Sequence, residues 1–182
     1  MSSGLLRTVV FGGVTILAGA GAQADDWPAH KRDALRSGVS SEHLDLTLRR
    51  RWTHRPQRPA RPEPGKELNR LDFDYAFQPV VADGLACFGS SADDTVRSLD
   101  AKTGKLVWRF TAEGSVRFAP AMGRGKAFAA SDDGVLHALD AQSAQLAWTF
   151  FASPGRDRLV GNDRLIARYP CRSGALLIDN IV

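Results

Sequence analysis

The chain repeats one short run of residues, Leu99-Asp100-Ala101-Lys102-Thr103-Gly104-Lys105-Leu106-Val107-Trp108, about forty positions later as Leu139-Asp140-Ala141-Gln142-Ser143-Ala144-Gln145-Leu146-Ala147-Trp148. Each copy has a leucine, an aspartate and an alanine before a turn, and a tryptophan after it. This period, with strand-like halves, is typical of β-propellers, in which each repeat forms one blade. We therefore expect an all-β fold.

Alternating apolar residues predict four short strands in each repeat. The first set is expected at 78–82, 85–90, 95–99 and 105–110, and the second at 118–122, 126–130, 135–139 and 145–150. A polar insertion follows Phe150, and residues 175–182 then resemble the opening of another blade. The prediction is a partial β-propeller with about two complete four-stranded antiparallel blades and two incomplete ones.

The turn before the fourth strand differs between the two copies. Asp100 can accept hydrogen bonds from the amides that follow it, and Gly104 can adopt the left-handed conformation that reverses the chain. Ala144 stands where Gly104 stood, and a left-handed alanine costs on the order of 1 kcal/mol. The second turn is therefore expected to be either strained or reshaped.

The amino terminus has the pattern of a signal peptide over residues 1–24. Arg7 precedes the apolar run 8–18, and Ala22-Gln23-Ala24 offers a cleavage position before Asp25. The run is too short and too rich in glycine and alanine for a stable membrane span, and an uncleaved anchor is the alternative. The mature protein is therefore expected to be periplasmic or secreted.

Composition fits one domain with a hydrophobic core. The chain has 182 residues, 43% of them hydrophobic, a net charge of +4 and two cysteines. Cys87 lies inside a strand pattern, where a small buried hydrophobe is usual, and Cys171 lies in a loop. A disulfide between them is not the expected arrangement.

Residues 25–65 form a distinct N-terminal segment before the blades, which would occupy 66–182. Alternating leucines predict an outer strand over 44–52 that ends in Trp52. The prolines and arginines of 49–64 then predict an extended basic linker. No aromatic interleaving accompanies these charges, so a nucleic-acid partner is not expected. Contact with an acidic envelope surface stays open.

The run from Leu99 to Trp108 resembles the repeat of the pyrroloquinoline quinone (PQQ)-like β-propellers. That family includes quinoprotein alcohol dehydrogenases and outer-membrane assembly factor B lipoproteins. The stretch from Trp27 to Asn180 is similar to the front end of larger exported bacterial proteins, so the chain resembles a truncated member. The resemblance implies that tryptophans dock neighbouring blades and that aspartates and a glycine shape the turns. These structural residues would be Trp52, Trp108, Trp148, Asp100, Gly104 and Asp140.

The resemblance does not decide the chemistry. Quinoproteins of this kind hold PQQ at the propeller centre with a calcium or lanthanide ion, a catalytic aspartate and often a vicinal disulfide, and this sequence has no Cys-Cys pair. Asp93-Asp94 and Asp132-Asp133 fall at expected hairpin turns, where aspartate is common. The four histidines lack zinc-ligand spacing. We assign no catalytic residue, no metal ligand and no cofactor, and PQQ with calcium remains the alternative.

Two residues are expected nearest the propeller axis, Gln78 and Arg117, where they could touch a ligand or bond to neighbouring loops. The leading hypothesis is a non-catalytic scaffold or binding module of the cell envelope. Its partner would be an envelope protein or a second copy, because uncovered blade faces expose apolar patches. The alternative is a PQQ-dependent oxidoreductase or a fragment of one.

Overall fold

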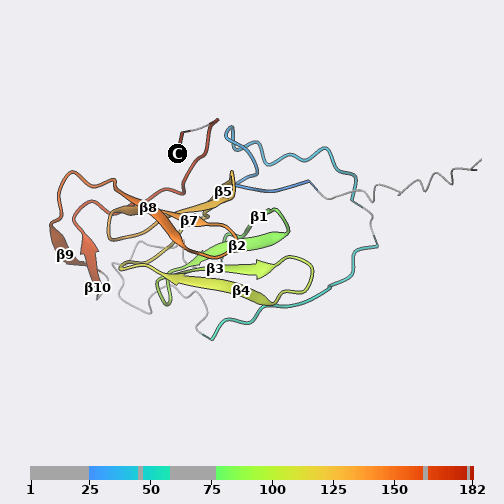
Figure 1. Ribbon diagram of the computed structural model, residues 1–182, viewed down its shortest axis with the longest axis horizontal. Coiled ribbons are helices and arrows are strands. Elements are labelled where there is room, and N and C mark those ends of the chain that lie inside the picture. The colour runs from blue at the N-terminus through green and yellow to red at the C-terminus, as the bar shows by residue number, and fades with distance from the viewer. Residues whose placement is uncertain (1–24, 45–46, 58–76, 162–163, 180) are drawn as a thin grey trace, which may run out of the picture.

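The regular structure is entirely β in the part of the chain that the computed structural model describes, residues 25–44, 47–57, 77–161, 164–179 and 181–182 (Figure 1). The first sheet contains β1 (Val80–Ala82), β2 (Leu85–Ser90), β3 (Thr95–Asp100) and β4 (Leu106–Thr111). The second contains β5 (Ala121–Gly123), β6 (Lys126–Ala130), β7 (Val135–Asp140) and β8 (Leu146–Phe151). Each sheet is antiparallel with strands in sequence order. The predicted four-stranded blades are confirmed.

The first strand of each blade is shorter than predicted. β1 begins after Pro79 and β5 after Pro120, although the expected strands started at 78 and 118. Proline has no backbone N–H to contribute to a strand ladder. The strand therefore starts only beyond the proline in both blades.

The two blades pack against each other around one core. β1 lies beside β5, and one cluster of buried side chains has members from both blades. Its members include Val80, Cys87, Val96, Trp108, Val116, Ala127, Ala129, Leu139 and Ala141. The indole of Trp108, on the fourth strand of blade 1, is thus part of a core that the two blades share.

Beyond residue 174, where the sequence predicted the opening of another blade, the described residues form no strand but one bridge. Ile178 and Ile181 form an isolated antiparallel bridge, which is the pairing that Ala82 makes with Leu85 in blade 1. The intervening Asp179 has a φ of 51°, like Asp83 in the first blade. The described residues thus hold two blades and a single bridge where another blade was predicted to open.

The polar insertion after blade 2 contains a hairpin that the sequence did not predict. β9 (Arg158–Gly161) pairs with β10 (Arg164–Ala167), and the hairpin lies at one end of the sheets (Figure 1). The Ala167 amide donates to the Asp132 carbonyl at 2.9 Å. Arg164 Nη1 lies 2.5 Å from Asp94 Oδ1. The hairpin therefore contacts the β2–β3 turn of one blade and the β6–β7 turn of the other.

The outer strand predicted over 44–52 does not form in its described part from 47 onward. A strand needs a neighbouring strand for its backbone groups, and the described residues supply none beside it. The predicted signal peptide over 1–24 and the part of the predicted linker beyond residue 57 lie outside the described residues. Within the described residues, no helix is long and apolar enough to cross a bilayer.

Candidate functional site

Two indoles bind equivalent carbonyl groups, one in the turn of each blade. Trp108 Nε1 of β4 donates to the Ala141 carbonyl at 2.7 Å, and the side chain is 7% exposed. Trp52 Nε1 donates to the Ala101 carbonyl at 3.0 Å. Ala101 and Ala141 are matching residues of the two repeats. We call the Trp52 contact the first seam and the Trp108 contact the second seam.

Matching aspartates fix the turns that present these carbonyls. The Asp100 carboxylate accepts hydrogen bonds from the Thr103 amide at 2.7 Å and the Thr103 hydroxyl at 2.7 Å. Asp140 accepts the same pair from Ser143, at 2.9 and 2.8 Å. These bonds hold the pKa of both carboxyl groups below its ordinary value. In each repeat, residues of the turn itself therefore fix the position of the carbonyl that accepts the indole hydrogen bond.

The two turns keep one backbone shape with different residues. Gly104 has a φ of 71° and Ala144 a φ of 60°, so the second turn is strained rather than reshaped. At Gly104 a Cβ would lie 2.5 Å from the Trp52 ring. The left-handed conformation favours glycine at both turns, but only at the first seam does the close approach of Trp52 also leave no room for a Cβ.

The third tryptophan lies on an exposed face. Trp148 pairs with Ala138 as Trp108 pairs with Ser98, yet it is 39% exposed. Its ring contacts Phe128, with centroids 5.9 Å apart. Leu146 and Phe150 of the same strand are also exposed. We call Leu146, Trp148 and Phe150 the open blade face.

A buried polar cluster lies at the second seam. The Ser131 hydroxyl contacts Asp133 Oδ1 and lies 3.1 Å from His137 Nε2, which is 4.0 Å from Asp133 Oδ2. Ser131 is fully buried, and the carboxylate approaches the nitrogen that faces the serine. A catalytic triad needs an accessible serine and a carboxylate on the other ring nitrogen. This cluster is therefore structural.

Burial controls the protonation of His137. Desolvation lowers its pKa from the ordinary value, while the charges of Asp133 and Glu113 act in the opposite direction. The ring also packs against Phe110 of blade 1, with centroids 5.2 Å apart. In blade 1 the matching pair is Arg97 with Asp93. Blade 2 thus has a titratable group where blade 1 has a permanent cation.

Asp132 is more than a turn residue. Its side chain is completely buried, with Arg117 Nε 2.7 Å from Oδ2 and Arg172 Nε 3.9 Å from Oδ1. Gln78, the other residue expected near the axis, accepts a hydrogen bond from the Ala119 amide at 3.3 Å. Both predicted axial residues therefore contact neighbouring loops.

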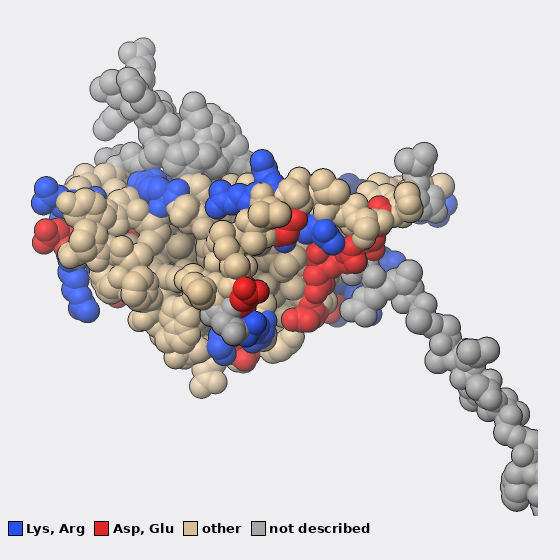
Figure 2. Space-filling model, turned by 90° about the horizontal axis from the view of Figure 1, so that it is seen from above, with Lys and Arg blue, Asp and Glu red and all other residues tan. Residues whose placement is uncertain are grey.

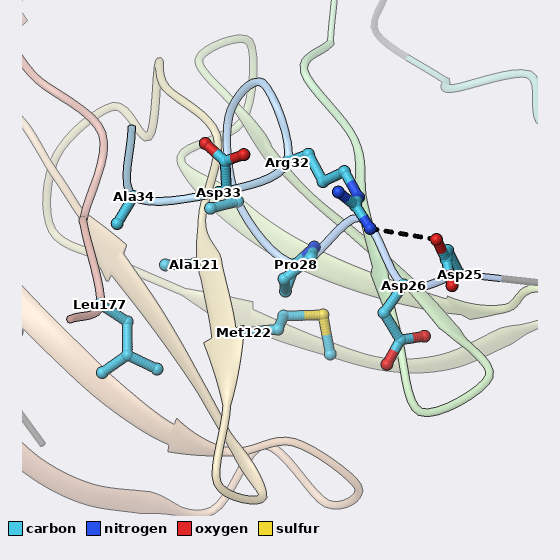
Figure 3. A pocket seen from close by; sticks show the side chains of 10 residues that line it. Asp25, Asp26, Pro28, Arg32, Asp33, Ala34, Ala121, Met122 and Leu177 are labelled. Atoms are coloured by element: carbon cyan, nitrogen blue, oxygen red, sulfur yellow. Dashed lines mark hydrogen bonds and ion pairs between the residues drawn. The ribbon is translucent and has the colours of Figure 1, made fainter. Parts of the chain in front are cut away.

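The N-terminal segment forms a pocket of about 450 Å³ beside the inner strands. Its polar residues are Asp25, Asp26, Arg32 and Asp33, and Arg32 Nη2 lies 3.0 Å from Asp25 Oδ2 (Figure 3). Pro28, Ala29, Ala34, Ala121, Met122 and Leu177 complete the lining. Asp and Glu side chains form a strip on the face seen in Figure 2, the side on which this segment lies in Figure 1. Among the charged residues that line the pocket, three carboxylates stand against one guanidinium, so its lining is acidic.

Neither cysteine forms a disulfide, and no metal-ligating group stands out among the described residues. Cys87 and Cys171 are free thiols. Burial raises the pKa of Cys87 to about 12, so this thiol is not a nucleophile at neutral pH. The described residues contain no group of three or more His, Cys, Asp or Glu side chains placed to hold a metal ion.

Two features of the structure had no clear signal in the sequence. Trp27 forms backbone hydrogen bonds to Val81, but a single bridged residue leaves no alternating pattern. Asp132 looks like any turn aspartate until Arg117 is placed beside it. The adjacent Asp133 makes this stretch look even more like an ordinary hairpin turn in the sequence.

Comparison with known proteins identifies the repeat. The family model described as outer membrane protein assembly factor BamB matches residues 45–176. A quinohemoprotein alcohol dehydrogenase from Comamonas testosteroni is 23% identical with a TM-score of 0.53, over 71% of this chain and 20% of that one. BamB from Moraxella catarrhalis is 22% identical with a TM-score of 0.35, over 37% of this chain and 20% of that one.

The chain thus spans about a fifth of the length of these solved structures. At such identities the likeness to the dehydrogenase shows the fold alone. No significant match was found among curated protein sequences.

Proposed function

Because the chain belongs to the PQQ-like repeat family whose model is described as outer membrane protein assembly factor BamB, we propose that it is a non-catalytic scaffold of the cell envelope. It is exported to the periplasm or beyond and binds a protein partner through its blade surfaces. A second copy of the chain is one such partner.

The open blade face is the observation that supports this proposal. The indoles of Trp52 and Trp108 each bond to a carbonyl of a blade turn, and Trp148 occupies the same strand position as Trp108 while 39% exposed. Exposed aromatic side chains with one polar group suit a protein interface, because they bury large area and orient one hydrogen bond. The face therefore offers a surface for another β structure.

Sedimentation of the mature chain across a concentration series tests this surface. We expect self-association, and we expect the double variant Trp148→Ser with Phe150→Ser to shift the chain toward monomer. Leu106→Ser is the control, because Leu106 is the blade 1 counterpart of Leu146 and is also exposed, at 57%. A wild-type chain that stays monomeric at high concentration and binds no envelope protein would contradict the proposal.

Export is tested separately by fractionating cells that express the full chain with a C-terminal tag. We expect the tagged protein in the periplasm or the medium, with its amino terminus near Asp25. Retention of the whole length in the cytoplasm would contradict the envelope location.

The competing activity is PQQ-dependent oxidation. Equilibrium dialysis of the mature chain with PQQ and calcium measures this directly, without needing a substrate. We expect no stoichiometric uptake. Saturable uptake of one PQQ per chain would contradict the scaffold proposal and favour a quinoprotein.

A further inference from the structure

The N-terminal segment bonds to the inner strands of both blades. The Trp27 amide donates to the Val81 carbonyl at 2.7 Å, and the Val81 amide donates back to Trp27 at 2.8 Å. The next carbonyl, that of Pro28, accepts from the Met122 amide at 2.7 Å. Figure 3 shows Pro28 directly beside Met122. Two consecutive residues therefore join β1 to β5.

These bonds occupy groups that would otherwise line the propeller axis. β1 and β5 are the first strands of their sheets, and the inner strands of a propeller surround its central channel. An edge strand presents unpaired N–H and C=O groups that need a partner. Here the partner is the chain itself, and Ala29 continues the contact with an exposure of only 8%.

The charges that line the pocket of this segment do not fit PQQ. The pocket is lined by three carboxylates, from Asp25, Asp26 and Asp33, and by one guanidinium, that of Arg32. Arg32 is already bonded to Asp25 at 3.0 Å. PQQ carries three carboxylates of its own, and like charges repel in a partly desolvated site. An anionic cofactor would therefore meet an acidic surface and backbone groups that are already paired.

We propose that residues 25–34 form an inner clasp that fills the axial position beside β1 and β5, holds the two blades together there, and excludes PQQ from this part of the axis. This proposal goes beyond the scaffold function, because it identifies the segment that occupies the propeller axis beside β1 and β5. The clasp also gives the blades a connection independent of Trp108, at the opposite edge of each sheet.

Hydrogen exchange of the mature chain, resolved to single amides, tests the clasp. We expect the Val81 and Met122 amides to be protected like those within the β2–β3 ladder. Trp27→Pro removes the donor to Val81, and loss of one such bond should speed exchange at these two amides about tenfold. Trp27→Phe keeps the backbone donor and should leave both unchanged. The β2–β3 amides report whether each variant is folded.

Each result has a distinct meaning. Fast exchange of Val81 and Met122 in the unaltered chain would overturn the clasp, even if Trp27→Pro failed to fold. Stoichiometric PQQ uptake with both amides still protected would overturn the exclusion. Loss of self-association alone would count against the scaffold and leave the clasp in place, so the two proposals fail separately.

Discussion

Trp108 and Trp148 occupy the same position in two copies of one repeat, yet only Trp108 is buried. Trp108 is paired with Ser98 and Trp148 with the matching Ala138. Trp108 is nevertheless 7% exposed and Trp148 39% exposed. The difference lies in the next β unit, which supplies the Ala141 carbonyl to Trp108. A docking residue is therefore encoded locally, while its contribution to stability depends on the neighbour that covers it.

Truncating the two indoles should give the largest contrast. Trp108→Ala leaves a cavity between the blades and should lower the free energy of unfolding by about 3–5 kcal/mol. Trp148→Ala removes a part-exposed ring and should cost about 1 kcal/mol or less. Urea denaturation followed by circular dichroism measures both. Equal losses would show that the open blade face is covered in solution.

The next prediction separates strain from contact at the turns. Gly104→Ala combines a left-handed alanine with a Cβ 2.5 Å from the Trp52 ring, and we expect a loss of roughly 2–3 kcal/mol. Gly125→Ala is the control, because its φ is +68° with no atom within 4 Å of the added Cβ. It should cost about 1 kcal/mol. If the two variants are equally destabilised, Trp52 does not pack on the turn in solution.

His137 should make the second seam sensitive to pH. Its pKa is lowered on folding by burial, so below about pH 6.5 the unfolded chain takes up a proton that the folded chain resists. The free energy of unfolding should therefore decrease as pH falls from 6.5 toward the folded pKa, by at most about 1.4 kcal/mol per pH unit.

Replacing the histidine tests the assignment of this slope. His137→Gln should flatten the dependence between pH 6.5 and 5, measured by denaturation at each pH. The same measurement on His54→Gln separates the contributions of the two histidines to the slope, because burial and Arg97 also lower the pKa of His54. If His137→Gln leaves the slope unchanged, the pH dependence of the free energy of unfolding comes from another titratable group.

The smallest expected effect is a gain in stability. Ala144→Gly relieves a left-handed alanine, worth about 1–2 kcal/mol, but increases the flexibility of the unfolded chain by about 0.4–1 kcal/mol. The free energy of unfolding should rise by roughly 0.5 kcal/mol. A loss in place of this gain would mean that the Ala144 methyl group stabilises the second seam by packing against the core.

The repeat made most of the fold predictable. Six of the eight blade strands were predicted within one residue, because apolar alternation and turn aspartates act over short distances. The first strands were placed too early, since prolines delay them. The β9–β10 hairpin was missed because Leu159-Val160 and Leu165-Ile166 are too short to show a period.

The contacts of the candidate site were harder to predict than the strands. The position of Trp52 was predictable by analogy with Trp108, but the strand expected around it does not form in residues 47–52. The buried ion pair of Asp132 with Arg117 depends on tertiary placement, as do the bonds of Trp27 and Pro28. Such contacts join distant segments and leave no local pattern.

The bonds of Trp27 and Pro28 also constrain the order of folding. Trp27 and Pro28 are synthesised well before their partners Val81 and Met122, which follow much later in the chain. Contacts between residues far apart in sequence form slowly, because a long loop must close first. Trp27 and Pro28 therefore cannot form these bonds until the chain as far as Met122 has been synthesised.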